Sequence, residues 1–455
     1  MNIAENIIVL GGGASGLSFG VITTKNSIII ESEARLGGHS RTTIQDGWTF
    51  DRGPHIIFSK NQLALECIVQ SLGRNVIKCK RNNKISFENK LLSYPIENGL
   101  NGLSFETRYK VFMSYIWWKI KKLFNPKFDD LEKWFLLNFG QSLVEMYFKP
   151  YNEKVWKTEF SKLADDWVER IPSPKVFDIF RGTILKKGTD GYLHQLYYHY
   201  PLLGGYESIM NSWAKLYSSK NSEKSEIRLN EKVIEIDLTG YFPTVRTDKK
   251  IYKDVPAVYT LPIKKIKSIC TGVPKYILTL IEKLQVNPMI VVSLGFEGDY
   301  LEEFTAIYFP DPDFLVNRIS FPHVFSSKNV PANSFMIQAE ITVGEGEDFK
   351  ADDLSIIQHV IEGLKQKGIL GENKLIFSKI DHYEEAYVVT KKGDVKRLNE
   401  IKKYFSDRNL YLHGRFGSHD YLNVDGCLIK SIELHNQIDS NIRNHDEILK
   451  AFRVD

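Results

Sequence analysis

The chain has 455 residues, which exceeds one ordinary domain core, so two or three domains are expected. Its hydrophobic fraction of 43% and charged fraction of 25% are those of a soluble globular protein. The net charge of +4 is small for this length and gives no reason to expect nucleic-acid binding, although it leaves room for a local basic pocket that holds an anion.

Cysteine usage and the start of the chain bear on the compartment. The cysteines lie far apart, with no CxxC pair and no metal-ligand spacing, at Cys67, Cys79, Cys270 and Cys427. We expect reduced, mostly buried thiols, no metal site and a cytoplasmic protein. The chain enters a strand directly at NIIVLGGG, and the basic and apolar segments of a signal peptide are missing there.

The first block of the chain, residues 3–60, reads as strand, glycine turn, helix, strand and loop. The next, residues 61–220, is mostly helical by its apolar periodicity, and residues 225–345 contain short alternating runs such as KVIEIDL and FMIQAEITV, which predict strands. The remaining elements are a helix over 351–368, a strand over 409–414 and a last helix over 427–450.

One predicted helix is unusually apolar, YKVFMSYIWWKIKKLF at 109–124. Lys119, Lys121 and Lys122 interrupt it, and the uncharged run is shorter than the ~20 residues that span a bilayer. We therefore expect no integral membrane segment but an amphipathic helix with one buried face. Contact with a membrane surface is the alternative.

The segment KPYNEKVWKTEF at 149–160 fits neither a helical nor a strand period. Pro150 predicts a helix break, because proline lacks the amide hydrogen and clashes with the preceding turn. Aromatic rings, an amide and charges then follow closely. The segment is either a surface corner with aromatic anchors or the wall of a polar ligand site.

The clearest motif is IIVLGGGASGLS, in which Gly11, Gly13 and Gly16 form G-x-G-x-x-G between an apolar strand and a helix. The glycines permit the tight turn, the approach of a pyrophosphate and close helix–strand packing. Glu31 ends the next strand about 20 residues on, where a ribose-binding carboxylate is expected. The sequence thus predicts a dinucleotide site.

The segment ESEARLGGHSRT at 31–42 resembles the second FAD signature of amine-oxidase and glutathione-reductase-like flavoproteins. KVIEID and PAVYTLP resemble the strands that complete their FAD domain, and YLHGRFGSHDY resembles their last flavin-contacting segment. The resemblance implies FAD, held by Gly11, Gly13, Ser15, Gly16, Glu31, Gly37, Gly38, His39, Ser40, Val233 near the adenine, and Arg415.

Further segments resemble the UDP-galactopyranose mutases, more their longer eukaryotic-type form, in the same order along nearly the whole chain. These segments are RGPHIIFSK (52–60), SYPIENG (93–99), FKPYNEKVWKTEFSKLADDWVERIPSP (148–174), AIYFPDPDFLVNRISF (306–321), AYVVTKKGD (386–394) and GRFGSHDYLNVD (414–425). In that family the segment around Pro150 lines the sugar-nucleotide cleft.

The activity implied is the interconversion of the pyranose and furanose forms of a nucleoside-diphosphate sugar. Reduced FAD attacks the anomeric carbon through N5 and forms a sugar adduct, so NADPH or another electron donor must reduce it. Arg170 and Arg318 match the diphosphate clamp and His55 the flavin-side histidine. The remaining matches are Tyr94 near the base, Asn152 and Trp156 beside the diphosphate and sugar, Tyr308, Tyr387 and Tyr421 on the diphosphate, and Asn423 on the sugar side.

The sequence departs from the family at several of these positions. Glu97 stands where the family has an amide that reads uracil, and its carboxylate can accept from uracil or from guanine. RGPH replaces a glycine pair before His55, Asp425 replaces an amide, and the loop at 188–206 keeps only its YP..GG ending. The nucleotide (UDP, GDP or dTDP), the sugar and the oligomeric state stay open.

The expected fold class is α/β, a Rossmann-like FAD-binding domain with an inserted helical domain and an antiparallel sheet domain. The FAD-binding domain is expected from 1–84, 216–284 and 396–455, the helical domain from 85–215 and the sheet domain from 285–395. A redox flavoenzyme of the amine oxidase or protoporphyrinogen oxidase type is the alternative function, because it shares the FAD domain. A non-catalytic flavin- or nucleotide-sugar-binding module is a second alternative.

Overall fold

The computed structural model describes residues 6–124, 127–128, 130–164, 174–185, 196–220, 225–300, 302–347, 352–439, 441 and 443–454. The chain divides into two compact units. Unit 1 comprises Met1–Lys78, Tyr198–Gln285 and Val395–Asp455, and unit 2 comprises Cys79–Tyr197 and Val286–Asp394. The short strands β5 (Ile77–Lys80) and β8 (Tyr197–Tyr200) are located where the chain passes from one unit to the other.

Unit 1 is built on a parallel sheet with the strand order β20-β13-β1-β2-β9. These strands are β1 (Asn6–Leu10), β2 (Asn26–Ile30), β9 (Ser225–Arg228), β13 (Ala257–Tyr259) and β20 (Leu410–Leu412). The central strands are short apolar runs because a parallel sheet is covered on both faces. The returning strand β20 completes the sheet, as the sequence predicts.

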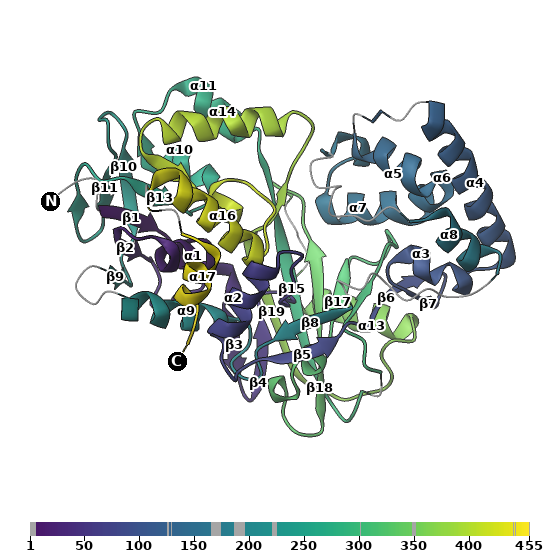
Figure 1. The fold of residues 1–455 in the computed structure, drawn as a ribbon. Helices are drawn as coiled ribbons and strands as arrows, with labels where there is room; N and C mark the ends of the chain where they lie inside the picture. Colours follow the sequence, from purple (N-terminus) through teal and green to yellow (C-terminus); the bar gives the residue numbers. More distant parts are fainter. Residues whose placement is uncertain are drawn as a thin grey trace. The chain divides into compact units, whose positions relative to one another are not determined.

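Helix α1 (Ala14–Ile22) packs on this sheet, and helix α16 (Val424–Ile438), from the opposite end of the sequence, packs against α1, so that the two lie side by side in Figure 1. Hydroxyls of Ser18 and Ser431, 2.7 Å apart, join them. The other helices of unit 1 are α2 (Gln62–Ser71), α9 (Glu207–Lys220), α10 (Ile266–Ile269), α11 (Lys275–Glu282), α14 (Asp394–Ser406), α15 (Gly414–Gly417) and α17 (His445–Ala451).

The remaining strands of unit 1 form two smaller sheets. A four-stranded sheet contains β10 (Val233–Asp237), β11 (Thr244–Thr247), β12 (Ile251–Tyr252) and β14 (Cys270–Thr271), and a hairpin contains β3 (Thr42–Gln45) and β4 (Trp48–Asp51). One prediction is wrong: the last helix over 427–450 is two helices, α16 and α17. The second begins anew because Asn444 and Glu447 form a reciprocal capping box.

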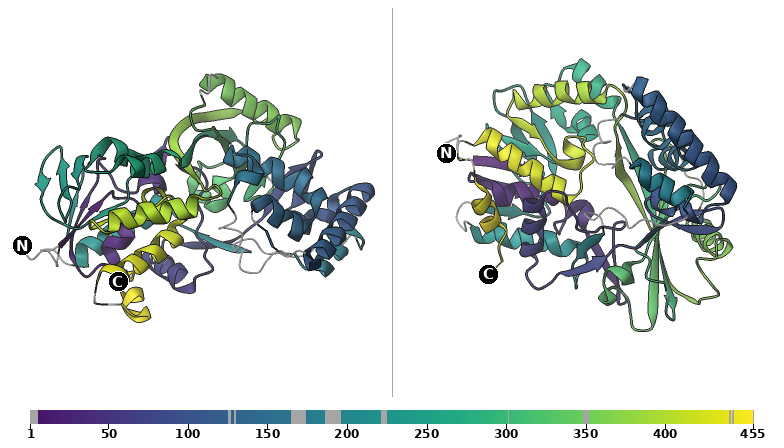
Figure 2. Two further views of the ribbon diagram at one scale, coloured as in Figure 1. Left: turned by 90° about the horizontal axis from the view of Figure 1, so that it is seen from above. Right: turned by 45° about the vertical axis from the view of Figure 1, so that its right-hand side comes forward.

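Unit 2 is built on a seven-stranded sheet with the order β19-β15-β18-β17-β16-β6-β7, in which β16 and β6 are parallel, whereas β15–β18, β18–β17, β17–β16 and β6–β7 are antiparallel. Its strands are β6 (Asn83–Phe87), β7 (Lys90–Ser93), β15 (Gln285–Glu297), β16 (Ala306–Tyr308), β17 (Arg318–Ser320), β18 (Ser334–Thr342) and β19 (Leu375–Val389). Helix α13 (Asp353–Gln366) covers one face of it (Figure 2), and the short helix α12 (Pro322–Phe325) follows β17.

The other α-helices of unit 2 share one core that includes Tyr115, Phe135 and Ile179. They are α3 (Ile96–Gly99), α4 (Phe105–Phe124), α5 (Leu131–Phe139), α6 (Gln141–Leu143), α7 (Lys149–Trp156) and α8 (Val176–Thr183). The predicted break at Pro150 is wrong. A π-helical turn, Val144–Phe148, runs directly into α7, and Pro150 lies at the start of α7, so the chain stays helical through the proline.

All four cysteines are free thiols, and Cys67 and Cys427 are buried. Across the ranges given above, none of the helices is both long enough and apolar enough to cross a bilayer.

Candidate functional site

The turn between β1 and α1 uses its glycines for distinct reasons. Gly11 has φ +109°, a left-handed value that favours glycine, and a Cβ at Gly16 would lie 2.0 Å from the carbonyl oxygen of Gly11. A Cβ at Gly13 would meet its nearest neighbour, the Cα of Gly38, at 3.9 Å. The first and third glycines are therefore needed by the protein itself, whereas the space around Gly13 is open.

The second glycine pair lies directly against this turn. The amide of Gly37 donates to the carbonyl of Gly12 at 2.9 Å, and Gly13 and Gly37 form a parallel bridge. Gly37 and Gly38 have φ values of +112° and +52°, and the short 3-10 turn Gly38–Ser40 follows. Two motifs that are about 25 residues apart in the sequence thus form one backbone surface.

Glu31 is buried beside the turn, and its carboxylate accepts from the amide of Gly12 at 2.9 Å and from that of Glu33 at 3.0 Å. The guanidinium of Arg41 lies 3.8 Å away. The acidic side chain therefore shapes the glycine turn as well as standing where a ribose hydroxyl is expected.

These residues fit a dinucleotide cofactor. Helix α1 has Gly13 as its N-cap, no side-chain cap and no acidic residue in its first turn, so its first amides remain available to an anion. Ser15 packs against Gly414 of α15: a Cβ at Gly414, which has φ +79°, would lie 2.0 Å from the Ser15 hydroxyl. The C-terminal segment predicted to contact flavin thus abuts the start of α1.

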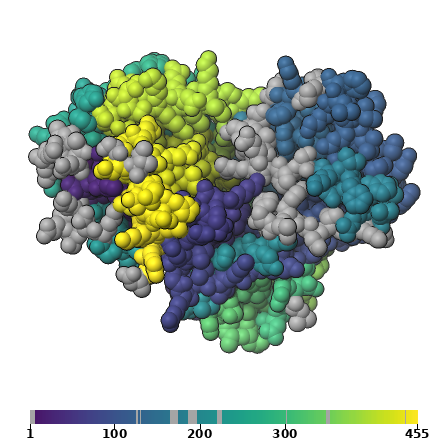
Figure 3. All heavy atoms as spheres, viewed as in Figure 1, coloured from purple at the N-terminus to yellow at the C-terminus, as the bar shows by residue number. Residues whose placement is uncertain are grey.

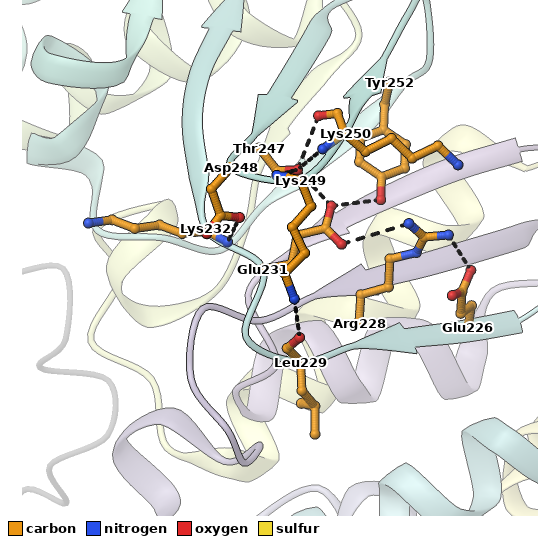
Figure 4. Close-up of polar contacts among 10 residues, drawn as sticks. All are labelled: Glu226, Arg228, Leu229, Glu231, Lys232, Thr247, Asp248, Lys249, Lys250 and Tyr252. Carbon is orange, nitrogen blue, oxygen red and sulfur yellow. Dashed lines mark hydrogen bonds and ion pairs between the residues drawn. The ribbon is translucent and has the colours of Figure 1, made fainter.

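The connection that leads to Val233, the first residue of β10, is fixed by a buried carboxylate (Figure 4). Glu231 accepts from the hydroxyls of Thr247 at 2.7 Å and Tyr252 at 2.9 Å, and its other oxygen lies 3.8 Å from Arg228. The amide of Glu231 donates to the carbonyl of Glu31 at 2.9 Å. Glu231 is therefore anchored to Glu31, the residue after β2, and Val233 follows Glu231 by two residues.

A second group of predicted residues gathers in unit 1 around His39 and Arg415. The His39 ring lies 4.5 Å from that of Phe416, and burial, followed by the positive charge of Arg415, lowers the pKa of His39 to about 3. His39 is thus a neutral imidazole. Arg415 lies 4.3 Å over the ring of Tyr421 and donates to the carbonyl of Leu422 at 3.2 Å.

His55 stacks on Tyr206 with ring centroids 4.9 Å apart, and its charge, when present, is among the influences that lower the pKa of His39. The hydroxyl of Ser59 donates to Asp425 at 2.6 Å, which ties the His55 loop to the start of α16, where Asn423 is the N-cap residue. The structure therefore brings the two predicted flavin-side loops together.

The sheet of unit 2 has one apolar face and an opposite face that we call the polar face because it carries the polar side chains. Alternate residues of β15, β17 and β18, among them Ile290, Ile319 and Ile337, pack with α13 in one hydrophobic core. Their neighbours point to the opposite face, because side chains alternate along a strand. That face carries Ser293, Arg318, Ser320, Gln338, Glu340 and Thr342. Met289, Val291 and Met336 lie on the same face, so it is mixed, and its buried polar groups need hydrogen-bond partners, as when Gln338 donates to Ser293 at 3.2 Å.

The central feature of this face is an ion pair between directly paired residues of β17 and β18. The Nε and Nη2 atoms of Arg318 lie 2.7 and 2.6 Å from one oxygen of Glu340, which is 3% exposed. Burial opposes the charge of Arg318, but Glu340 together with Tyr387, Tyr308 and Tyr151 outweighs burial and raises the arginine pKa well above its ordinary value. Arg318 is therefore a permanent, oriented cation.

Aromatic rings surround Arg318 in unit 2. Its guanidinium lies 5.9 Å over Tyr308, and Tyr308 stacks on Tyr94 at 4.8 Å. Tyr151 meets the edge of Tyr308 at 5.8 Å and stacks on Tyr147 at 5.7 Å. Burial is the main cause that raises the pKa of the Tyr94, Tyr147 and Tyr151 phenols, so they are neutral.

Helix α7 presents Asn152 and Trp156 one turn apart. The indole of Trp156 donates to the Asn152 side-chain oxygen at 3.0 Å, and its ring meets Tyr387 edge-on at 5.7 Å. Lys154, on the same helix, donates to the carbonyls of Phe309 at 2.9 Å and Asp311 at 2.7 Å. It therefore fastens α7 to the segment that follows Tyr308.

Glu97 is 5% exposed in the short helix α3, which packs against Gly182 of α8. It is close enough to Tyr94 and Tyr147 to raise both phenol pKa values, after burial and after neighbouring tyrosines. The structure thus assembles Tyr94, Glu97, Asn152, Trp156, Tyr308, Arg318 and Tyr387 within unit 2. Arg170 and part of the 188–206 loop lie outside the described residues.

Sequence reasoning missed Glu340, Lys154, Tyr147, Tyr151 and Glu231. A signal existed for Glu340, because a lone carboxylate inside the apolar strand SFMIQAEIT needs a buried partner. For Lys154 there was none, since its partners are backbone carbonyls more than 150 residues away.

The chain resembles known flavoproteins in sequence and in fold. The family model described as flavin containing amine oxidoreductase matches residues 17–382. The mitochondrial protoporphyrinogen oxidase of Nicotiana tabacum is 26% identical over 161 residues, a match that spans 32% of this chain and 32% of that protein. The aligned region is therefore about a third of that relative.

Solved structures extend the likeness to nearly the whole chain. A reduced UDP-galactopyranose mutase has a TM-score of 0.87 at 21% identity and covers 98% of this chain and 96% of its own. A putative protoporphyrinogen oxidase from Exiguobacterium has a TM-score of 0.71 at 17% identity and covers 95% and 98%. At these identities the structures establish the shared fold.

Proposed function

The chain belongs to the flavin-containing amine oxidoreductase family and is a flavoenzyme with FAD as its cofactor, and we propose that it acts as a nucleotide-sugar mutase. In this proposal it interconverts the pyranose and furanose forms of a nucleoside-diphosphate sugar.

The observation that carries the proposal is the Arg318–Glu340 pair on the polar face of the unit 2 sheet. Two of the five guanidinium N–H groups point to Glu340, which leaves the others for phosphate oxygens. Guanidinium geometry suits a diphosphate, whose charge grows as it leaves the sugar. In the proposal Arg170 is the second clamp residue.

The division of roles follows from the two units. When bound and reduced, the flavin supplies the nucleophile for the anomeric carbon, and NADPH or another donor supplies its electrons. In unit 1 the amides at the start of α1 would hold the cofactor pyrophosphate, and Glu31 would bind a ribose. Val233 would lie near the adenine, and Ser40 would support the second glycine loop. His39, as a neutral imidazole, would border the flavin ring together with His55 and Arg415, while Tyr421 would face the diphosphate and Asn423 the sugar.

In unit 2 the phenol groups of Tyr308 and Tyr387 donate hydrogen bonds to the diphosphate. Asn152 and Trp156 hold the sugar, and Tyr94 with Glu97 binds the nucleobase. The carboxylate of Glu97 accepts one N–H from uracil or thymine and two adjacent N–H groups from guanine. UDP, GDP and dTDP sugars are therefore the substrates to test.

A second candidate is a net redox reaction of the amine oxidase or protoporphyrinogen oxidase type. The family and the matched tobacco protein favour it. An oxidase of an apolar substrate has no need of a buried arginine–glutamate pair on a polar sheet face, so we rank it second.

A reduction-dependent turnover assay separates the two. The purified holoenzyme is reduced with dithionite without oxygen and incubated with UDP-, dTDP- and GDP-sugars, and products are analysed by chromatography and mass. The mutase predicts a product of unchanged mass that requires reduced enzyme and is lost in Arg318→Ala and Arg170→Ala. Steady hydrogen peroxide from an amine or porphyrinogen, with no sugar isomer, would establish the oxidase instead.

A further inference from the structure

The outer face of α4 is apolar, on the side opposite to the core of unit 2. We use "outer face" for its exposed apolar residues, whose exposed fractions run from 45% for Ile120 to 85% for Phe124. They are Phe105, Tyr109, Met113, Trp117, Ile120, Leu123 and Phe124. Spacings of three and four residues place them in one stripe along a 20-residue helix.

The inner side of the same helix is already packed against the core of unit 2. Val111 and Tyr115 are fully buried in the helical core of unit 2, and Phe112 lies 5.9 Å from Phe180 of α8. A surface helix normally shows polar residues opposite its buried stripe. Helix α4 therefore carries a second apolar stripe that the fold of unit 2 does not use.

Helix α8, next to α4, also exposes apolar side chains. It packs against α4, and their atoms lie in the same lobe of unit 2 in Figure 3. Val176 and Phe177, at its start, are 49% and 64% exposed. The seven exposed apolar side chains in one stripe of α4 mark an interaction surface rather than isolated exposed side chains.

The charges along α4 are strongly one-sided. Arg108, Lys110, Lys119, Lys121 and Lys122 outnumber Glu106; Arg108 is buried and Lys110 pairs with Glu106, so the positive charge not compensated within the helix lies at Lys119, Lys121 and Lys122, near its end. Lys121 lies 5.3 Å over the ring of Trp117 and 4.4 Å over that of Trp118, beside the stripe. Long lysine side chains in this position keep their charge at the edge of an apolar surface.

We propose that the outer face of α4 docks on an anionic lipid surface. Aromatic and aliphatic side chains between lysines match the chemistry of a helix that lies in the headgroup region, with the lysines on lipid phosphates. A two-fold contact with a second copy would instead bring equal positive charges together. The inference does not depend on the catalysed reaction.

The test is co-sedimentation of the full-length holoenzyme with vesicles. Vesicles of phosphatidylcholine alone are compared with vesicles that also contain phosphatidylglycerol, at low and high salt. We expect binding to the anionic vesicles that weakens with salt. Leu123→Ser should lower the partition coefficient about tenfold, and Lys121→Gln about fivefold.

Matched controls come from elsewhere in unit 2. Leu354, which is 78% exposed in α13, matches Leu123 at 81%, so Leu354→Ser should leave binding unchanged. Lys374→Gln, whose side chain is 74% exposed, controls for Lys121. If Leu123→Ser does not fold, the Lys121→Gln variant and the salt dependence decide the question.

Three results would overturn the proposal. They are equal binding to neutral and anionic vesicles, binding that both α4 variants leave unchanged, and self-association through α4 with no vesicle binding. Turnover in solution is measured separately, so failure of the docking proposal and failure of the proposed mutase activity are distinguishable.

Discussion

The two units make their candidate sites from different materials. In unit 1 the site is backbone: glycines at 11, 13, 16, 37 and 38, and the uncapped amides of α1. In unit 2 it is side chains: Arg318 and Glu340 from neighbouring strands, with the ring of Tyr94, which follows β7, and rings from α7, β16 and β19 around them. A site made of backbone amides requires glycine at a few positions and accepts most side chains at the others. A site made of side chains depends on contacts between residues far apart in the sequence.

This difference predicts where each unit is vulnerable, and the largest effect should come from the glycine turn. Gly16→Ala places a Cβ 2.0 Å from the Gly11 carbonyl oxygen, so the turn cannot form and bound FAD should be lost. Flavin absorbance per chain measures it.

Gly13→Ala is the informative partner variant. Its Cβ would meet nothing closer than 3.9 Å, so the melting temperature should not change. FAD binding should weaken by about tenfold or more, because the backbone at this position must approach the pyrophosphate. Gly371→Ala, with its nearest atom at 3.4 Å, serves as the control. Full flavin content in Gly16→Ala would contradict the assignment of the turn.

The next largest effect concerns the buried pair of unit 2. Glu340→Gln removes the charge that orients Arg318, and we expect a loss of about 3 kcal/mol in the free energy of unfolding. If Arg318 binds diphosphate, kcat/KM should also fall about 10- to 100-fold. Urea denaturation and sugar-isomer turnover measure the two separately.

Glu297→Gln is the matched control on the same sheet, because its partner Lys374 is 3.4 Å away and both side chains are more than half exposed. It should change stability by less than about 0.5 kcal/mol. Equal effects of the two variants would show that burial of the Arg318 pair has no special role.

Lys154 predicts a pH dependence confined to unit 2. Burial lowers its pKa from 10.5 to about 7, so above that pH the folded state has lost a proton that the unfolded state keeps until 10.5. Stability should therefore rise between these values, by at most about 1.4 kcal/mol per pH unit. Below pH 7 both states are protonated and the slope disappears.

Comparison of urea denaturation from pH 7 to pH 9 with that of Lys154→Met tests this, because the variant lacks the titrating amine. The rise attributed to Lys154 should be missing from the variant. Parallel curves for the two proteins would refute it.

The smallest effect should come from the aromatic wall. Trp156→Phe keeps the ring but removes the hydrogen bond to Asn152, which should cost about 1 kcal/mol of stability. Trp117→Phe, at an exposed position on α4, should cost almost nothing. Thermal melts of both variants measure the difference, and equal losses would mean that the indole–amide bond contributes nothing.

Much of unit 1 could be predicted because its signals are local. The apolar run before Gly11, the glycine spacing and the returning strand near 410 each specify one element, and together they give the parallel sheet. The break between α16 and α17 was missed because the capping box at Asn444 does not interrupt the apolar periodicity from which the helix was predicted. The continuation of the helix through Pro150 was missed because a π-helical turn has no simple sequence period.

By itself the sequence determined the dinucleotide turn, since glycines with positive φ and no room for a Cβ leave the chain a single local solution. It also determined which residues are candidates for the substrate side. The tertiary structure alone decided that Arg318 faces Glu340, that Lys154 reaches two carbonyls of a distant segment, and that α4 keeps a second apolar stripe. The reason is physical: strand register and helix packing are set by contacts between residues far apart in the chain, and no short stretch of sequence contains both partners.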